Sequence, residues 1–249
     1  MEKAMERLSS GLRVNSAADD AAGLAVAGKM ESQLRGINMA IRNNQDGAGL
    51  IQTAEAGVNE IRNMVLRIRE LAVQMANGIY EDSPDRANAQ LEVEALQAQV
   101  NLIAGYTRFN DVSLLNGSFS AVDIQAGNTT SETIALTITT MTTTGLGFDS
   151  VSVSTQSNAQ AAITTMDTAL TDIATEQATL GSYTNRLNYS VANLSRSSVM
   201  TEQALGRIMD ADFASESTAL SKAQILNQAA TAMLAQANQS KNLMLQLIN

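Results

Sequence analysis

Apolar residues recur at alternating three- and four-residue intervals through the first third of the chain. This spacing is typical of a helix that buries one stripe of side chains, here called the seam, against another helix. It predicts a long helix from about residue 17 to residue 76, ended by Asn77-Gly78. Gln33, Asn44 and Gly47 interrupt the seam. Its apolar members are Val26, Met30, Ile37, Ala40, Ile51, Ala54, Val58, Ile61, Val65, Ile68, Ala72 and Met75.

Two later segments repeat this spacing. Ser83-Pro84-Asp85 supplies a capping serine, a proline suited to the first helical turn and an early carboxylate, so we predict a shorter helix from there to about Thr107. A second long helix is predicted between Ile163 and Ile208. Its seam also carries polar residues, which cost stability and help to fix the register: Gln177, Thr184, Ser198 and Thr201. The expected fold is mainly α, a long antiparallel coiled-coil-like helical bundle with the shorter helix as its third member.

The middle of the chain, residues 108–156, has a different pattern. Thr, Ile and Val alternate with a period of two residues at 122–124, 134–138 and 151–153, and this alternation is typical of short, half-buried strands. Glycines between these segments supply turns. We therefore expect a small β-hairpin region in the middle of the helical bundle.

The last segment, from Phe213 to Asn249, is predicted to be a helix rich in Ala, Gln, Leu and Met. After Glu216 its only charged residues are Lys222 and Lys241. An amphipathic helix with so little charge has little to keep it monomeric in water, so it is expected to associate with a partner. The apolar residues that we expect to carry this self-assembly are Ile225, Leu226, Met233, Leu234, Leu243 and Leu247.

Composition excludes several kinds of chemistry. The chain has no histidine and no cysteine, so imidazole bases, thiol nucleophiles and the usual zinc ligands are absent. A net charge of -9 argues against nucleic-acid binding. No apolar run is long enough to span a membrane, and no cleavable signal peptide is recognisable. Asp19-Asp20 and Asp210/Asp212 are interpreted as helix-start charges rather than metal ligands. We expect no enzyme activity, no cofactor and no metal.

Four stretches of the sequence resemble bacterial flagellin, the subunit of the flagellar filament. Near the N-terminus, Glu6–Gly23 reads ERLSSGLRVNSAADDAAG, and Arg67–Gly78 reads RIRELAVQMANG. Near the other end, Met209–Glu216 reads MDADFASE, and SKAQIL at 221–226 is followed by LAQANQ at 234–239. The resemblance covers nearly the whole chain except parts of the central region.

This resemblance implies a secreted, extracellular filament protein used for motility, exported through the flagellum's own channel with its export apparatus and chaperone. It implies that residues 1–16 are a remnant of the inner-tube segment and its connector. Residues 17–107 and 157–208 would then be the two halves of the helical shell, with the hairpin region between them. Residues 209–249 would be the inner-tube helix, and other flagellin subunits the partners.

The sequence departs from the family pattern in two ways. Members of the family carry about thirty largely helical residues before the motif that here begins at Glu6, so the chain is expected to be an N-terminally shortened form. The large outer variable domains of many flagellins are also missing. With half of its inner tube absent, the chain alone is expected to be monomeric or poorly associated.

The resemblance also points to a surface for recognition by the Toll-like receptor of innate immunity. The matching residues are Arg67 and Leu71, which are four residues apart on one helix face, and Glu92 beyond the turn. A solvated face or a contact between subunits explains the same residues equally well.

Two alternatives to a filament subunit remain at this stage. One is a cell-surface binding module on the same scaffold, which captures a receptor or an extracellular polysaccharide. The other is the related protein that joins hook to filament. A zinc protease of the kind found in some flagellins needs a His-Glu-x-x-His helix, which a chain without histidine lacks.

Overall fold

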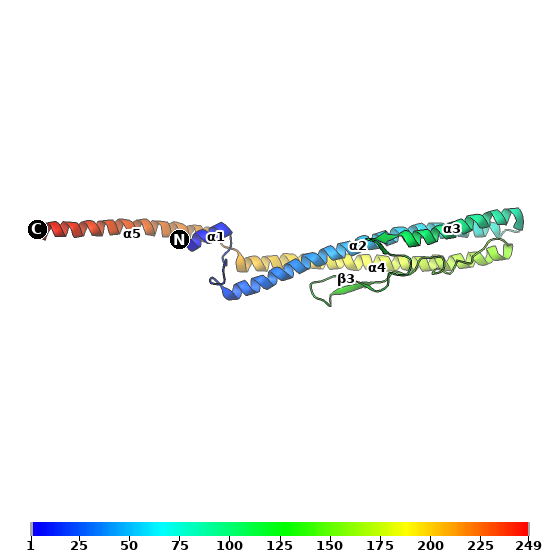
Figure 1. The fold of residues 1–249 in the computed structure, drawn as a ribbon, viewed down its shortest axis with the longest axis horizontal. Helices are drawn as coiled ribbons and strands as arrows, with labels where there is room; N and C mark the ends of the chain where they lie inside the picture. The colour runs from blue at the N-terminus through cyan, green and yellow to red at the C-terminus, as the bar shows by residue number, and fades with distance from the viewer. Residues whose placement is uncertain (1, 249) are drawn as a thin grey trace. The chain divides into compact units, whose positions relative to one another are not determined.

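The computed structural model describes residues 2–248, and the side-chain surroundings of residues 2–240. Most of these residues are helical, which confirms the mainly α fold (Figure 1). The α-helices of the described residues are α1 Glu2–Ser10, α2 Ala21–Met75, α3 Ala87–Tyr106, α4 Gln156–Met209 and α5 Phe213–Ile248.

The chain divides into two compact units. One unit contains Met1–Arg35 and Ser197–Asn249, and the other contains Gly36–Arg196. Residues of α2 and α4 belong to both units. The second unit holds the large apolar core, formed by α2, α3, α4 and the central strands.

Within the second unit α2 and α4 run antiparallel, as expected. The Arg69 guanidinium of α2 donates to Asp167 of α4 at 2.7 Å, and Gln177 of α4 donates to Asn59 of α2 at 2.7 Å. From the first contact to the second, the residue number falls from 69 to 59 on α2 and rises from 167 to 177 on α4. The polar seam residue Gln177 therefore joins the two helices at a fixed register.

The predicted seam of α2 is buried through the second unit, from Ile37 to Met75. The seam prediction is wrong in the first turns of the helix, because Val26 is 46% exposed whereas its neighbour Ala27 is buried. The period of a straight α-helix, 3.6 residues, drifts against a strict 3.5-residue repeat. The buried stripe in this part of α2 therefore includes a residue next to the predicted position.

The third helix, α3, begins later than predicted. Ser83 is extended and caps nothing, and α3 starts at Ala87 after a single wide turn, η1 Asp82–Arg86. The prediction that Ser83 caps this helix is therefore wrong. The helix folds back on α2, as expected, and its buried side chains Val93, Val100 and Ala104 join the core.

The central region contains two small antiparallel sheets among the described residues. β1 Arg108–Phe109 pairs with β2 Val112–Ser113, and β3 Val122–Gln125 pairs with β4 Thr133–Leu136. The hairpin of β3 and β4 was predicted from its alternation. The strand predicted at 151–153 is wrong, because the backbone N–H of Val153 donates to the Gln90 side chain of α3 at 2.7 Å instead of to a strand.

Two of the three interruptions of the α2 seam, Asn44 and Gly47, lie where the β3–β4 hairpin packs against the helix, whereas Gln33 is exposed. The Asn44 side chain is buried and donates to the carbonyl of Ala126 at 3.1 Å. A Cβ atom at Gly47 would lie in van der Waals contact with Leu187 of α4 at 3.4 Å and with Ile124 of β3 at 3.5 Å, so α4 and the hairpin both pack against the helix there. A Cβ atom at Gly36 would overlap the Asn128 side chain at the hairpin tip. Glycine and asparagine thus occupy the positions of α2 that the hairpin approaches.

In the first unit the segment after α1 pairs with the segment before α5. The Arg13 N–H donates to the Met209 carbonyl at 2.6 Å, and the Ala211 N–H donates to the Gly11 carbonyl at 3.0 Å. Of the four carboxylates predicted as helix-start charges, Asp20 and Asp212 act as caps, whereas Asp19 accepts from Lys3 and Ser16 and Asp210 follows the end of α4. Asp20 accepts from the Gly23 N–H at 2.8 Å at the start of α2, and Asp212 accepts from the Ala214 N–H at 3.0 Å at the start of α5.

Candidate assembly and recognition surfaces

The helix α5 is covered by α1 only over its first turns. Gly11 bonds to Ala211, and the Arg7 guanidinium bonds to Glu216 at 2.9 Å, so the two helices run antiparallel. The half-buried residues of α5 in this part lie at Glu216, Ser217, Leu220 and Ala223. From residue 224 to residue 240 every described side chain of α5 is exposed.

This exposed part of α5 carries the apolar residues that the sequence assigned to self-assembly. Ile225, Leu226, Met233 and Leu234 are between 59% and 72% exposed. These four positions spread over about half of the helix surface, as a broad stripe that also contains Ala229, Ala230 and Ala237. The side chains of Leu243 and Leu247 lie outside the described residues. Between residues 217 and 240 the only charge is Lys222.

The residues assigned to receptor recognition lie at two different depths. The Arg67 guanidinium on α2 donates to Glu92 on α3 at 2.8 Å, and both side chains are about half exposed. Leu71 is only 4% exposed and belongs to the core. The Glu92 carboxylate, by hydrogen bonding and by charge, raises the pKa of Arg67 above its ordinary value. The geometry therefore brings Arg67 and Glu92 together on the surface and places Leu71 beneath them.

A neighbouring ion pair ties α2 to α4. Arg69 donates to Asp167 at 2.7 Å, and this carboxylate raises the pKa of Arg69 above its ordinary value. Both side chains are partly exposed, so the pair is worth only a modest amount of stability. Its main effect is on helix register.

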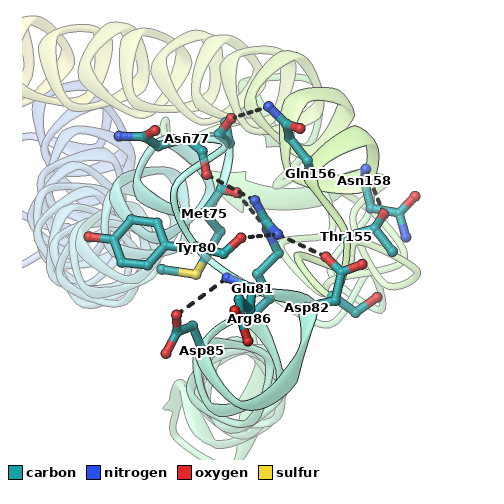
Figure 2. Close-up of polar contacts among 12 residues, drawn as sticks. Met75, Asn77, Tyr80, Glu81, Asp82, Asp85, Arg86, Thr155, Gln156 and Asn158 are labelled. Carbon is teal, nitrogen blue, oxygen red and sulfur yellow. Dashed lines mark hydrogen bonds and ion pairs between the residues drawn. The ribbon is translucent and has the colours of Figure 1, made fainter.

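The sequence reasoning missed a buried arginine that organises the turn between α2 and α3. Figure 2 shows the Arg86 side chain pointing back at the end of α2, where its nitrogens donate to the carbonyls of Met75 at 2.9 Å, Asn77 at 2.9 Å and Tyr80 at 2.6 Å. It also pairs with Asp82 at 2.8 Å. The last carbonyls of a helix have no intrahelical partner. The guanidinium therefore caps α2. It does so from a buried position, since Arg86 is only 4% exposed.

The start of α4 adds a second contact to the same turn. The Gln156 amide donates to the Ala76 carbonyl at 3.1 Å (Figure 2). The ends of α2, α3 and α4 are therefore held together by polar side chains at this end of the second unit. An arginine immediately after Ser83-Pro84-Asp85 was the available sequence signal.

The acidic residues do not form a metal centre in the described part of the chain. No group of three or more acidic side chains there lies close enough to hold a metal ion. Asp19 instead accepts from Lys3 and Ser16, and the Lys3 ammonium contributes most to lowering its pKa. Across the described residues, none of the helices combines the length and the apolar character that crossing a membrane requires.

Comparison with known proteins identifies the family. The sequence profile of the bacterial flagellin N-terminal helical region matches residues 1–120, and that of the bacterial flagellin C-terminal helical region matches residues 163–248. The flagellin of Halalkalibacterium halodurans is 40% identical over 99% of this chain and 91% of its own length. The chain belongs to the bacterial flagellin family.

Two further relatives of this flagellin agree with the assignment. The flagellar filament 33 kDa core protein of Treponema phagedenis is 40% identical over the full chain and 92% of its own length. The crystal structure of Bacillus cereus flagellin is 32% identical, with a TM-score of 0.55 over 61% of this chain and 88% of that chain. The flagellin described here is thus a structural protein of the extracellular flagellar filament rather than a separate binding module.

Proposed function

We propose that this chain joins its neighbours in the filament through the exposed apolar stripe of α5. The observation that carries the proposal is the run from residue 224 to residue 240, in which four large apolar side chains are each at least 59% exposed. Burying such a side chain against a partner is worth about 1.5–3 kcal/mol. A stripe of this size drives helix association when several copies repeat the contact.

The stripe can be tested by adding charge on it and beside it. Leu226→Asp and Leu234→Asp place carboxylates on the stripe, whereas Gln224→Asp and Gln228→Asp place the same charges at exposed positions on the side of α5 turned away from Leu226. Purified chain is mixed with short filament fragments as seeds, and the fraction that sediments with them is measured. We expect the stripe variants to stay in the supernatant and the control variants to sediment like the parent. Equal sedimentation of both pairs would exclude the stripe as the assembly surface.

A second proposal concerns the surface formed by Arg67 and Glu92. Family resemblance supports an innate immune receptor as its partner, and the half-exposed ion pair is accessible in the single chain. Leu71, buried beneath, would support the helix surface rather than contact the receptor. An arginine that pairs across two helices is a common anchor of protein interfaces.

Receptor recognition is tested by a cell assay of receptor signalling. Arg67→Asp reverses the charge and repels Glu92, so signalling is expected to fall sharply. Arg62→Asp, at an exposed position of the same helix, serves as the control and should keep its signalling. If Arg67→Asp signals like the parent, the surface is not used by the receptor.

Family membership also supports export by the flagellar apparatus with its chaperone. Deleting the export apparatus should keep the chain inside the cell, whereas deleting a general secretion pathway should not. The net charge of -9 disfavours binding to acidic extracellular polysaccharides. Equilibrium binding to neutral and acidic polysaccharides separates this activity from assembly.

A further inference from the structure

Asn116 lies in the exposed loop between β2 and β3 and is followed by Gly117. Its side-chain oxygen Oδ1 accepts two hydrogen bonds from Ser118, one from the backbone N–H at 3.0 Å and one from the hydroxyl at 2.6 Å. The backbone bond closes an Asx turn, which folds the asparagine side chain over the peptide that follows it. Cγ of Asn116 and the backbone nitrogen of Gly117 are both members of the ring that this hydrogen bond closes.

We propose that Asn116 modifies itself by cyclising onto the nitrogen of Gly117, giving a succinimide and then aspartate or isoaspartate. The Gly117 nitrogen attacks Cγ of Asn116, and a C–N bond forms while negative charge builds on Oδ1. The bond from Cγ to Nδ2 then breaks. Nδ2 leaves as ammonia and carries away the proton given up by Gly117. Solvent water opens the ring at either carbonyl, so the reaction needs no oxidant and no cofactor.

Ser118 supplies the catalytic donors of this reaction. Two donors already aimed at the oxygen on which charge develops stabilise the tetrahedral intermediate, as the donors of an oxyanion hole do. Gly117 has no side chain to shield its nitrogen, and its φ of +89° is a conformation that favours glycine. The loop is exposed on both sides of the reacting bond, so water reaches the succinimide.

The chain contains a second Asn-Gly sequence, Asn77-Gly78, which is an internal comparison. Its Oδ1 accepts a hydrogen bond from the Ile79 N–H at 3.2 Å, and among the described residues no hydroxyl donates to it. The Asn77 carbonyl is held by Arg86 in the capped turn after α2. We therefore infer that Asn116 reacts first in the folded chain, although both sites have the same reacting pair of residues.

The modification changes a segment that two core residues hold in place. Leu115 and Phe119 are buried on either side of the loop, and their carbonyls accept hydrogen bonds from Met141 at 2.8 Å and Ile138 at 3.2 Å. Isoaspartate adds a methylene group to the backbone between these anchors, and either product adds one negative charge. Both backbone bonds are then expected to open more often.

The test follows both sites in the full chain during incubation at mildly alkaline pH. Peptide mapping by mass spectrometry, with detection of isoaspartate, measures conversion at each asparagine, and hydrogen exchange follows the amides of Ile138 and Met141. In the folded chain Asn116 should convert well ahead of Asn77. In denaturant the two sites should convert at similar rates, because only the shared Asn-Gly chemistry remains. Exchange at both amides should accelerate as Asn116 converts.

Two variants separate the Ser118 donors from the sequence effect. Ser118→Ala removes one hydrogen bond, so conversion at Asn116 should slow about two- to tenfold while conversion at Asn77 is unchanged. Ser118→Thr keeps the hydroxyl and should restore the rate, and Ser120→Ala removes a nearby exposed hydroxyl as the matched control. The proposal is overturned if Asn77 converts as fast as Asn116 in the folded chain. It is also overturned if Ser118→Ala does not slow Asn116.

Discussion

Replacing Arg86 by methionine tests whether the buried guanidinium holds the turn between α2 and α3. Methionine keeps an unbranched side chain of similar reach but donates no hydrogen bonds. The change removes donors from the carbonyls of Met75, Asn77 and Tyr80 and breaks the pair with Asp82. The core around the side chain stays filled, so the loss of hydrogen bonds is the dominant effect.

The magnitude follows from these contacts. A hydrogen bond to a charged group contributes about 1.5–3 kcal/mol, so three carbonyls give a gross loss of about 4.5–9 kcal/mol. Part of this is recovered, because Asn77 and Tyr80 are not fully buried and water reaches their carbonyls. Methionine also avoids the cost of burying a charge. We expect the free energy of unfolding to fall by about 3–4 kcal/mol.

Urea unfolding followed by circular dichroism measures this loss. Because the chain forms two compact units, the transition that belongs to residues 36–196 is the one expected to shift. Arg62→Met, at an exposed position of α2, is the matched control and should change stability by less than about 0.5 kcal/mol. A loss below about 1 kcal/mol for Arg86→Met would refute the capping role, since water would then satisfy the carbonyls equally well.

Three further predictions follow from other contacts. Within the described residues Glu176 is 4% exposed and its Oε1 has no hydrogen-bond partner, so Glu176→Met should raise the free energy of unfolding by about 1–2 kcal/mol in a urea titration. Because Lys3 and Ser16 lower the folded-state pKa of Asp19 below its ordinary value of 3.8, their stabilisation is present above about pH 4 and lost as the pH falls below it. Amide exchange around Ser16 should therefore accelerate in acid, and Asp19→Asn should remove this pH dependence. Gly36→Ala should push the Asn128 side chain away from α2 and loosen the hairpin tip, measured by hydrogen exchange at Asn128, because the added methyl group overlaps that side chain. Since Asn128 is exposed and alanine favours a helix by about 1 kcal/mol over glycine, the free energy of unfolding should change by less than about 1 kcal/mol.

The helices were predictable because their signal repeats over many residues. The seam from Ile37 to Met75 and the return of the same spacing after Ile163 fix two long helices and, with the turns between them, an antiparallel bundle. The end of α2 at Met75 agrees with the stop expected at Asn77-Gly78. The apolar spacing and the stop signal are properties of the whole helix, so one misplaced residue such as Val26 does not change the predicted helix.

Local features that depend on a distant partner were not predictable. The serine at 83 has the composition of a helix cap, but Arg86 satisfies the end of α2 and the chain is extended at Ser83. The 151–153 segment alternates like a strand, but Gln90 of α3 takes its backbone donor. At 151–153 a side chain from another helix thus prevails over the local preference, and at Ser83 the wide turn that carries Arg86 replaces the predicted cap.

The candidate surfaces were predictable to different degrees. The stripe of α5 follows from one helix and its lack of charge, and the structure leaves its described part exposed. The Arg67 surface depends on the packing of α2 against α3, which the sequence does not encode residue by residue. The family motif therefore assigned both Leu71 and Arg67 to receptor recognition, although of these two only Arg67 is accessible.

The close approach of the β3–β4 hairpin to α2 has a consequence for protein engineering. Flexible loop tips usually accept inserted peptides, because nothing holds them. This tip is different, since Asn128 lies over Gly36 and the Gln125 side chain bonds to the tip carbonyls of Gly127 and Thr129. The exposed turn at Asp149–Ser150 is held in a similar way, because the Gln97 amide of α3 donates to the carbonyls of Phe148 at 2.8 Å and Val151 at 3.2 Å on either side of it. A displayed epitope or a grafted domain at either loop is therefore expected to lower the stability of this flagellin.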